Sequence, residues 1–206
     1  ILFVDELSSA PPALHPPLLG LIQAKRIGGT QLPRTARVFA AANPPECAAG
    51  GFDLAPPVAN RLGHVQWPMP TAEAWSDYML GGASGVIKPI DAAAISARVD
   101  AEWSARFAAA SALSTGFVRA NPGALHKMPT EGSASKAWPS HRTWELATRA
   151  NASTTLLGAS DDTRMTLIGA FVGDAVAAEF AAWAARQDLP DAGALPDGKE
   201  TFKHDP

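Results

Sequence analysis

An acidic pair follows a short apolar run at the start of the sequence, and this combination of residue types can do hydrolytic chemistry. Residues 1–4 read ILFV, and Asp5 and Glu6 come directly after them. A continuous apolar run is typical of a strand that is buried on both faces in a parallel sheet. Its carboxyl end lies where open α/β sheets bind ligands. One carboxylate could hold Mg²⁺ through water while the other polarises an attacking water. Strands often end in acids, so the pair alone is a weak signal.

Two more polar residues follow predicted elements in the same stretch. Asn43 ends the apolar segment 36–43, ARVFAAAN, and a neutral amide there could orient a water and contact a phosphate without adding negative charge. An Asn-Pro turn is the alternative explanation, because it is common. Arg61 ends a predicted short helix and could reach a phosphate that a neighbouring subunit holds. A solvated surface arginine is the alternative for this residue.

The elements that would position these residues form an α/β pattern. Apolar runs predict strands at 1–4, 36–43 and 64–67, with helical segments between them, and this order favours an α/β sheet. Pro16 and Pro17 place a break or a late start of the first helix near residue 16. Gly and Pro residues at 26–35 indicate a connection, with a small hairpin as one form of it.

Helical patterns dominate after residue 71. They cover 71–80, 91–120, 141–151 and 161–187, with a loop rich in Gly, Ser and Pro at 121–140. We therefore expect a boundary near 68–72, with α/β structure before it and all-α structure after it.

The last helical segment is the most apolar part of the chain. Residues 167–186 carry Asp174 and Glu179, so we interpret them as one alanine-rich amphipathic helix rather than a membrane span. The proline-containing tail from residue 188 is expected to be disordered.

Composition narrows the classes of function. The chain has 206 residues, of which 47% are hydrophobic and 18% charged, so a packed core is expected. A formal net charge of −3 makes nucleic acid and anionic membranes unlikely partners. Cys47 is the only cysteine, which excludes an internal disulfide and favours a reducing, cytoplasmic setting. The start of the chain lacks the basic region of a signal peptide.

The order and spacing of these segments resemble the MoxR-like, dynein-related branch of the AAA+ ATPases. ILFVDE is similar to the Walker B strand, AAANPP to sensor 1, and ANRLGHV to the arginine-finger segment. The family usually has Arg-Phe in that last segment, where this chain has Arg61-Leu62. KAWPSHRTWELATRA resembles the start of the sensor 2 helix, with His141 where a proline is often found.

This resemblance implies a fold and a domain organisation. Residues 1–70 would be part of an AAA+ P-loop-type parallel sheet core, and residues 71–187 a small all-α lid, followed by the tail 188–206. Arg142 would contact nucleotide phosphates from the lid. The alternative is an amphipathic helix with Trp138 and Trp144 in the lid core and Arg142 in solvent.

The resemblance also implies roles, cofactors and partners. Asp5 would bind Mg²⁺, Glu6 would activate water, Asn43 would contact the γ-phosphate of ATP, and Arg61 would reach the nucleotide of an adjacent subunit. The expected assembly is a ring of identical subunits, a hexamer, that remodels a protein substrate. Members of this group often act with von Willebrand A-type proteins, so the resemblance implies a partner of that class, and no membrane partner is expected.

The phosphate loop of such ATPases, G-x-x-x-x-G-K-[ST], does not occur in the sequence. We therefore expect the chain to be the C-terminal part of a longer ATPase and to be inactive alone. The rival hypothesis is a non-catalytic module with the AAA+ fold that serves assembly or scaffolding. A chelatase-type or nucleic-acid motor subunit is a third hypothesis, and the acidic balance argues against the nucleic-acid version.

Overall fold

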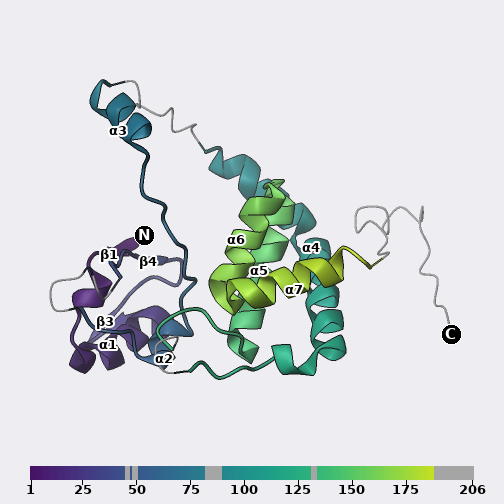
Figure 1. Cartoon of the computed structure of the whole chain (residues 1–206), viewed down its shortest axis with the longest axis horizontal. Helices are drawn as coiled ribbons and strands as arrows, with labels where there is room; N and C mark the ends of the chain where they lie inside the picture. The colour runs from purple at the N-terminus through teal and green to yellow at the C-terminus, as the bar shows by residue number, and fades with distance from the viewer. Residues whose placement is uncertain (45–46, 48–50, 82–89, 131–133, 188–206) are drawn as a thin grey trace.

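The computed structural model describes residues 1–44, 47, 51–81, 90–130 and 134–187. Figure 1 shows a smaller body of strands and short helices, a helix that stands away from it, and a bundle of longer helices. The chain is therefore mixed α/β, as predicted. The expected disordered tail, 188–206, lies outside the described residues.

Two short parallel strands form the sheet of the smaller body. β1 (Leu2–Val4) pairs with β4 (Val38–Ala40), and Leu2 lies opposite Val38 in the register. These strands confirm the predicted ones at 1–4 and 36–43, although β4 is shorter than its apolar segment.

The prediction that the first strand is buried on both faces is wrong. Phe3 is 60% exposed and its register partner Phe39 is 56% exposed. Alternate side chains of a strand point to opposite faces, so these two rings share one face of the sheet. No described helix or strand covers that face, whereas Leu2 and Val4 are half-buried on the other.

The connection between the strands is a series of short turns. The two prolines at 16 and 17 lie in the first turn of α1, where a missing N–H costs no helical hydrogen bond, so the helix begins close to the predicted point. The predicted hairpin is also present, since β2 (Arg26–Ile27) and β3 (Thr30–Gln31) pair antiparallel around Gly28, whose φ is +53°. In order the elements are η1 (Leu7–Ser9), η2 (Pro12–Leu14), α1 (His15–Leu19), η3 (Gly20–Ala24), β2 (Arg26–Ile27) and β3 (Thr30–Gln31).

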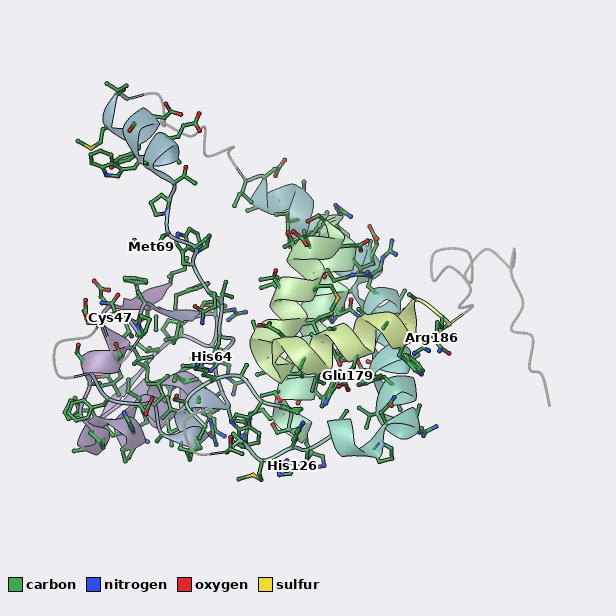
Figure 2. The ribbon with its side chains drawn as sticks, in the orientation of Figure 1. Cys47, His64, Met69, His126, Glu179 and Arg186 are labelled. Carbon is green, nitrogen blue, oxygen red and sulfur yellow. The ribbon has the colours of Figure 1, made fainter. Side chains whose placement is uncertain are left out.

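The prediction of a third strand at 64–67 is wrong. After α2 (Pro56–Ala59) the chain docks on the helical bundle, where the His64 N–H donates to the Ala170 carbonyl at 2.8 Å. The last carbonyls of a helix lack partners within that helix, so the end of α6 (Asp161–Val172) supplies the acceptor that a neighbouring strand would otherwise supply. Figure 2 shows His64 where the smaller body meets the bundle.

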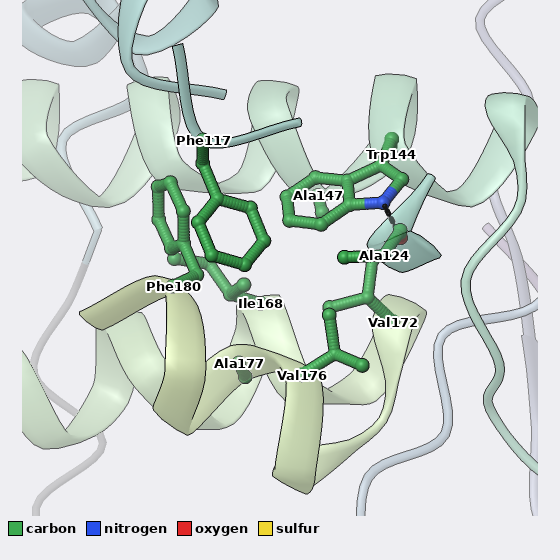
Figure 3. Close-up of a cluster of buried hydrophobic side chains, with 9 residues drawn as sticks. All are labelled: Phe117, Ala124, Trp144, Ala147, Ile168, Val172, Val176, Ala177 and Phe180. Atoms are coloured by element: carbon green, nitrogen blue, oxygen red, sulfur yellow. Dashed lines mark hydrogen bonds between the residues drawn. The ribbon is translucent and has the colours of Figure 1, made fainter. Parts of the chain in front are cut away.

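Four helices form the bundle: α4 (Ala92–Ala120), α5 (His141–Leu157), α6 (Asp161–Val172) and α7 (Asp174–Ala184). Phe117, Trp144 and Phe180 meet at its centre, with ring centroids 5.5–5.8 Å apart (Figure 3). The indole Nε1 of Trp144 donates to the Ala124 carbonyl at 2.8 Å, which satisfies the buried N–H. The helical patterns at 91–120 and 141–151 are confirmed, and α5 extends to Leu157.

Residues 167–186 form two helices rather than the single helix that was predicted. The break lies at Gly173, which has φ +84° and ψ 146°, a conformation open essentially to glycine alone. Gly169 leaves room for the start of α7 (Asp174–Ala184), because a Cβ there would lie 2.6 Å from Asp174 Oδ1 and 3.6 Å from its Cα. No helix in the described ranges is long and apolar enough to cross a membrane.

The helix predicted at 71–80 is also present as α3 (Ala72–Met79). It stands apart from both bodies in Figure 1, at the end of a segment that contains Met69 (Figure 2). None of its residues is buried.

Candidate functional site

The carboxyl ends of β1 and β4 bring the first three predicted site residues together. Because the strands are parallel neighbours, Asp5 and Glu6 leave the sheet at the same edge as Asn43. The Asn43 amide Nδ2 donates to Glu6 Oε1 at 3.3 Å across 37 residues of sequence. The other carboxylate oxygen of Glu6 accepts from Ser9 Oγ at 3.3 Å. Sequence reasoning did not single out Ser9.

Backbone contacts hold Glu6 in a conformation that is unusual for its residue type. Its φ of 54° and ψ of 40° lie in the left-handed region, which costs a non-glycine residue on the order of 1–2 kcal/mol. The N–H of Glu6 donates to Asp5 Oδ1 at 3.0 Å, and the N–H of Leu7 donates to the Ala41 carbonyl at 2.9 Å. The bond to Ala41, one residue beyond β4, therefore helps to hold the turn that aims Glu6 toward Asn43.

A small hollow lies between these side chains. Its volume is about 80 Å³, and it is lined by Asp5, Glu6, Ala41, Ala42 and Asn43. Such a space holds a few waters or a hydrated cation but not a nucleotide. Carboxylate and amide oxygens suit Mg²⁺, which is bound through one or two carboxylates plus waters and substrate phosphates. The described residues contain no cluster of three or more His, Cys, Asp or Glu, so phosphate oxygens would have to complete the coordination.

The predicted arginine-finger residue lies just after α2, beside α1. Arg61 Nε donates to Gln23 Oε1 at 3.1 Å, and its NH1 group donates to the Pro57 carbonyl. Burial and, to a smaller extent, the positive charge of Arg142 lower the pKa of the Arg61 guanidinium from its ordinary value. The positive charge of Arg142 thus acts on Arg61, although one residue comes from the smaller body and the other from α5. Within the described ranges neither has an acidic partner.

A buried polar contact brings these arginines together. Ser140 Oγ donates to Asn60 Oδ1 at 2.9 Å, and both residues are buried. Asn60 precedes Arg61, and Ser140 is the N-cap of α5, whose first turn contains Arg142. The same hydroxyl accepts from the Thr143 N–H at 3.2 Å, so α5 is capped and docked by one side chain. Sequence reasoning missed Asn60 and Ser140; the S-x-x-T spacing before the helix was the available signal.

The structure places the predicted site residues in two groups. Asp5, Glu6 and Asn43 form one group, and Arg61 and Arg142 form the other. In the part of the chain that is described, no hydrogen bond or ion pair joins the groups. Cys47, which lies on the loop after Asn43, is exposed (Figure 2).

Comparison of this chain with protein-family models, with curated proteins and with solved structures finds no match.

Proposed function

We propose that this chain is part of an AAA+-type ATPase that couples hydrolysis of Mg-ATP to remodelling of a protein partner. The observation that supports this most directly is the hydrogen bond from Asn43 to Glu6. It sets an amide and a potential general base side by side at the ends of two parallel strands, next to a hollow of about 80 Å³. That edge is where open α/β sheets bind ligands.

Each residue at this edge of the sheet would have a different role in hydrolysis. Asp5 would hold Mg²⁺ through water, and Glu6 would accept the proton of an attacking water while Asn43 orients that water. Bound Mg-ATP would supply the phosphoryl group and the charge that these residues act upon. Glu6 accepts one hydrogen bond on each carboxylate oxygen, from Asn43 and from Ser9, and each oxygen keeps a second lone pair with which it could accept from the water.

The arginine pair fits the same activity as a phosphate-binding element between subunits. In the described ranges neither Arg61 nor Arg142 has an acidic partner, and a phosphate bound by both would gain two charge-assisted contacts. Arginines supplied by a neighbour stabilise charge during phosphoryl transfer. Action on a neighbour's nucleotide would require a ring of identical subunits, which is the assembly expected of this proposal.

A second candidate is a module that does not bind nucleotide and serves assembly. The specific observation in its favour is that the phosphate-loop motif G-x-x-x-x-G-K-[ST] does not occur in the 206-residue sequence. The ATPase proposal therefore requires a phosphate loop from polypeptide outside these residues.

Paramagnetic Mn²⁺ tests the acidic edge in the chain as it stands. Adding Mn²⁺ with inorganic pyrophosphate should broaden the backbone amide signals of Glu6 and Asn43 before others, because Mn²⁺ replaces Mg²⁺ at oxygen ligands. Asp5→Asn should remove this selectivity, whereas Asp53→Asn, at an exposed loop acid, should leave it intact. Uniform broadening in the unsubstituted chain contradicts a cation site at this edge.

Hydrolysis distinguishes the two candidate functions. ATP turnover should be absent from this chain alone and present in the longest polypeptide of its reading frame that carries a phosphate loop. Glu6→Gln in that polypeptide should lower turnover by at least about 10²-fold while nucleotide binding persists. A polypeptide with a phosphate loop and no turnover would favour the assembly module.

A further inference from the structure

Helix α3 presents an unpartnered aromatic face. Trp75, Tyr78 and Met79 are 55%, 66% and 61% exposed, and their spacing places them on one side of the helix. The acidic residues Glu73 and Asp77 lie on the opposite side. The helix is thus amphipathic, although no described element packs against its apolar side (Figure 1).

A helix of this length needs a packing partner. α3 has 8 residues, and isolated helices shorter than about 12–15 residues are marginal in water. Its N-cap contributes, since Thr71 Oγ1 accepts from the Ala74 N–H at 3.1 Å, but one cap is worth only about 1 kcal/mol. Burial of the aromatic face is therefore the main stabilisation still open to it.

A groove of matching chemistry lies between α4 and α5. Its volume is about 320 Å³, which accommodates one or two aromatic side chains. The walls are apolar at Phe107, Val118 and Trp144, and the hydroxyls of Ser111 and Thr115 line the same space. Hydroxyls next to apolar walls suit tryptophan and tyrosine, which carry a polar tip on an apolar ring.

The charge at the groove is complementary to the charge of α3. Arg119 lines the groove, is exposed, and has no ion-pair or hydrogen-bond partner in the described ranges. Glu145, the acid of the groove, is already bound by Arg149 at 2.9 Å. The groove thus has an excess of positive charge, whereas residues 71–81 carry two acids and no cation. Arg119 can also stack on an aromatic ring that enters the groove.

The two surfaces lie apart within one chain. α3 stands beyond the N-terminal end of α4 in Figure 1, whereas the groove residues belong to the C-terminal half of this 29-residue helix. At 1.5 Å per residue, Phe107 lies about 22 Å along the axis from Ala92. A second molecule can bring an α3 to this groove without any rearrangement of the chain.

We propose that α3 of one chain docks through Trp75, Tyr78 and Met79 into the α4–α5 groove of a second copy. The contact joins different surfaces, so it is heterologous and propagates until a ring closes or a filament grows. It does not depend on nucleotide binding. The proposed ATPase can therefore fail its tests while this contact stands, and the reverse also holds.

Mass measurement by light scattering after size exclusion tests the contact in the full chain. The chain should elute well above its monomer mass of 21.4 kDa. Trp75→Ala with Tyr78→Ala should reduce it to the monomer, and so should Thr115→Arg, which fills the groove. Trp67→Ala and Thr155→Arg are matched controls at an exposed tryptophan outside α3 and an exposed threonine outside the groove, and they should leave the mass unchanged.

Mixing the two monomeric variants tests whether the contact joins α3 of one chain to the groove of another. The α3 variant keeps its groove and the Thr115→Arg variant keeps its α3, so an equimolar mixture should form one-to-one pairs. A monomeric unsubstituted chain at about 100 μM, far above the Kd of a stable interface, would overturn the proposal. Failure of the mixture to pair would overturn it too.

Cross-linking covers the case in which a variant loses its fold. In a Cys47→Ser background, chains with Met79→Cys and chains with Thr115→Cys should form disulfide-linked pairs when mixed and oxidised, above the level of either alone. The doubly substituted chain should give a ladder of multimers. A cross-link confined within one chain would show that α3 docks on its own groove and would overturn the proposal.

Discussion

At the scale of single residues, Glu6 combines backbone strain with the chemistry proposed for it. Its φ of 54° suits glycine better than an acid, whereas a β-branched residue tolerates it least. Glu6→Val should therefore lower the free energy of unfolding by about 1–2 kcal/mol, and Glu6→Gly should not lower it. Urea unfolding measures both. Equal losses from the two substitutions would show that the side-chain contacts, and not the backbone, stabilise this turn.

Arg142 gives a second prediction at this scale, because within the described ranges its guanidinium has no acidic partner and its charge acts on the nearby Arg61 cation. Pyrophosphate should raise the Tm of the chain, and Arg142→Gln should weaken its apparent affinity about tenfold, the effect of one lost charge-assisted contact. Arg186→Gln, at an arginine on the far end of the bundle (Figure 2), is the control and should bind as the unsubstituted chain does. Equal affinities for all three chains would remove the arginine pair as an anion site.

Substitution of Ser140 can show how much the contact between the two bodies adds to stability beyond ordinary helix capping. Ser140→Ala loses the α5 cap and the bond to buried Asn60, so it should cost about 2–3 kcal/mol. Ser160→Ala loses only the α6 cap, where Ser160 Oγ accepts from the Thr163 N–H at 3.2 Å, and should cost about 1 kcal/mol. Thermal unfolding of both variants gives the difference. Equal costs would mean that the Asn60 bond contributes nothing.

At the scale of elements, the sequence predicted the helices and strands that depend on a local pattern of apolar residues. α4 and α5 followed from their helical periodicity, and the shared edge of Asp5 and Asn43 followed from two apolar runs that form parallel strands. The segment at 64–67 carries a strand-like pattern, but its hydrogen bond goes to the end of α6. The hydrogen bond between Ser140 and Asn60 joins the segments that carry Arg142 and Arg61. Ser140 and Asn60 are 80 positions apart in the sequence, so no local periodicity could predict their contact.

The helix break at Gly173 is a second feature that the local sequence pattern did not predict. Substitution of this glycine tests why the break occurs. Alanine-rich sequence on both sides hides the break between α6 and α7, which glycine permits at φ +84°. A Cβ there would also lie 3.3 Å from the Ala137 carbonyl oxygen, so Gly173→Ala should destabilise the chain by about 1–3 kcal/mol. Gly123→Ala, at a site with open space around the added Cβ, should cost far less in the same denaturant titration. Tolerance of Gly173→Ala would mean that α6 and α7 can run on as one helix.

At the scale of the whole molecule, the helical bundle and the smaller body differ in how well they bury their aromatic side chains. The bundle buries its aromatic rings, whereas the sheet of the smaller body exposes Phe3 and Phe39 side by side on one face. Because most of the Phe39 ring is already in water, Phe39→Ser should cost less than about 1.5 kcal/mol of stability. It should nevertheless lower the fluorescence of a bound hydrophobic dye such as ANS, which reports exposed apolar clusters. Phe52→Ser, which leaves the Phe3–Phe39 pair intact, should keep more of that fluorescence. A large stability loss from Phe39→Ser with unchanged dye binding would mean that this face of the sheet is covered in solution.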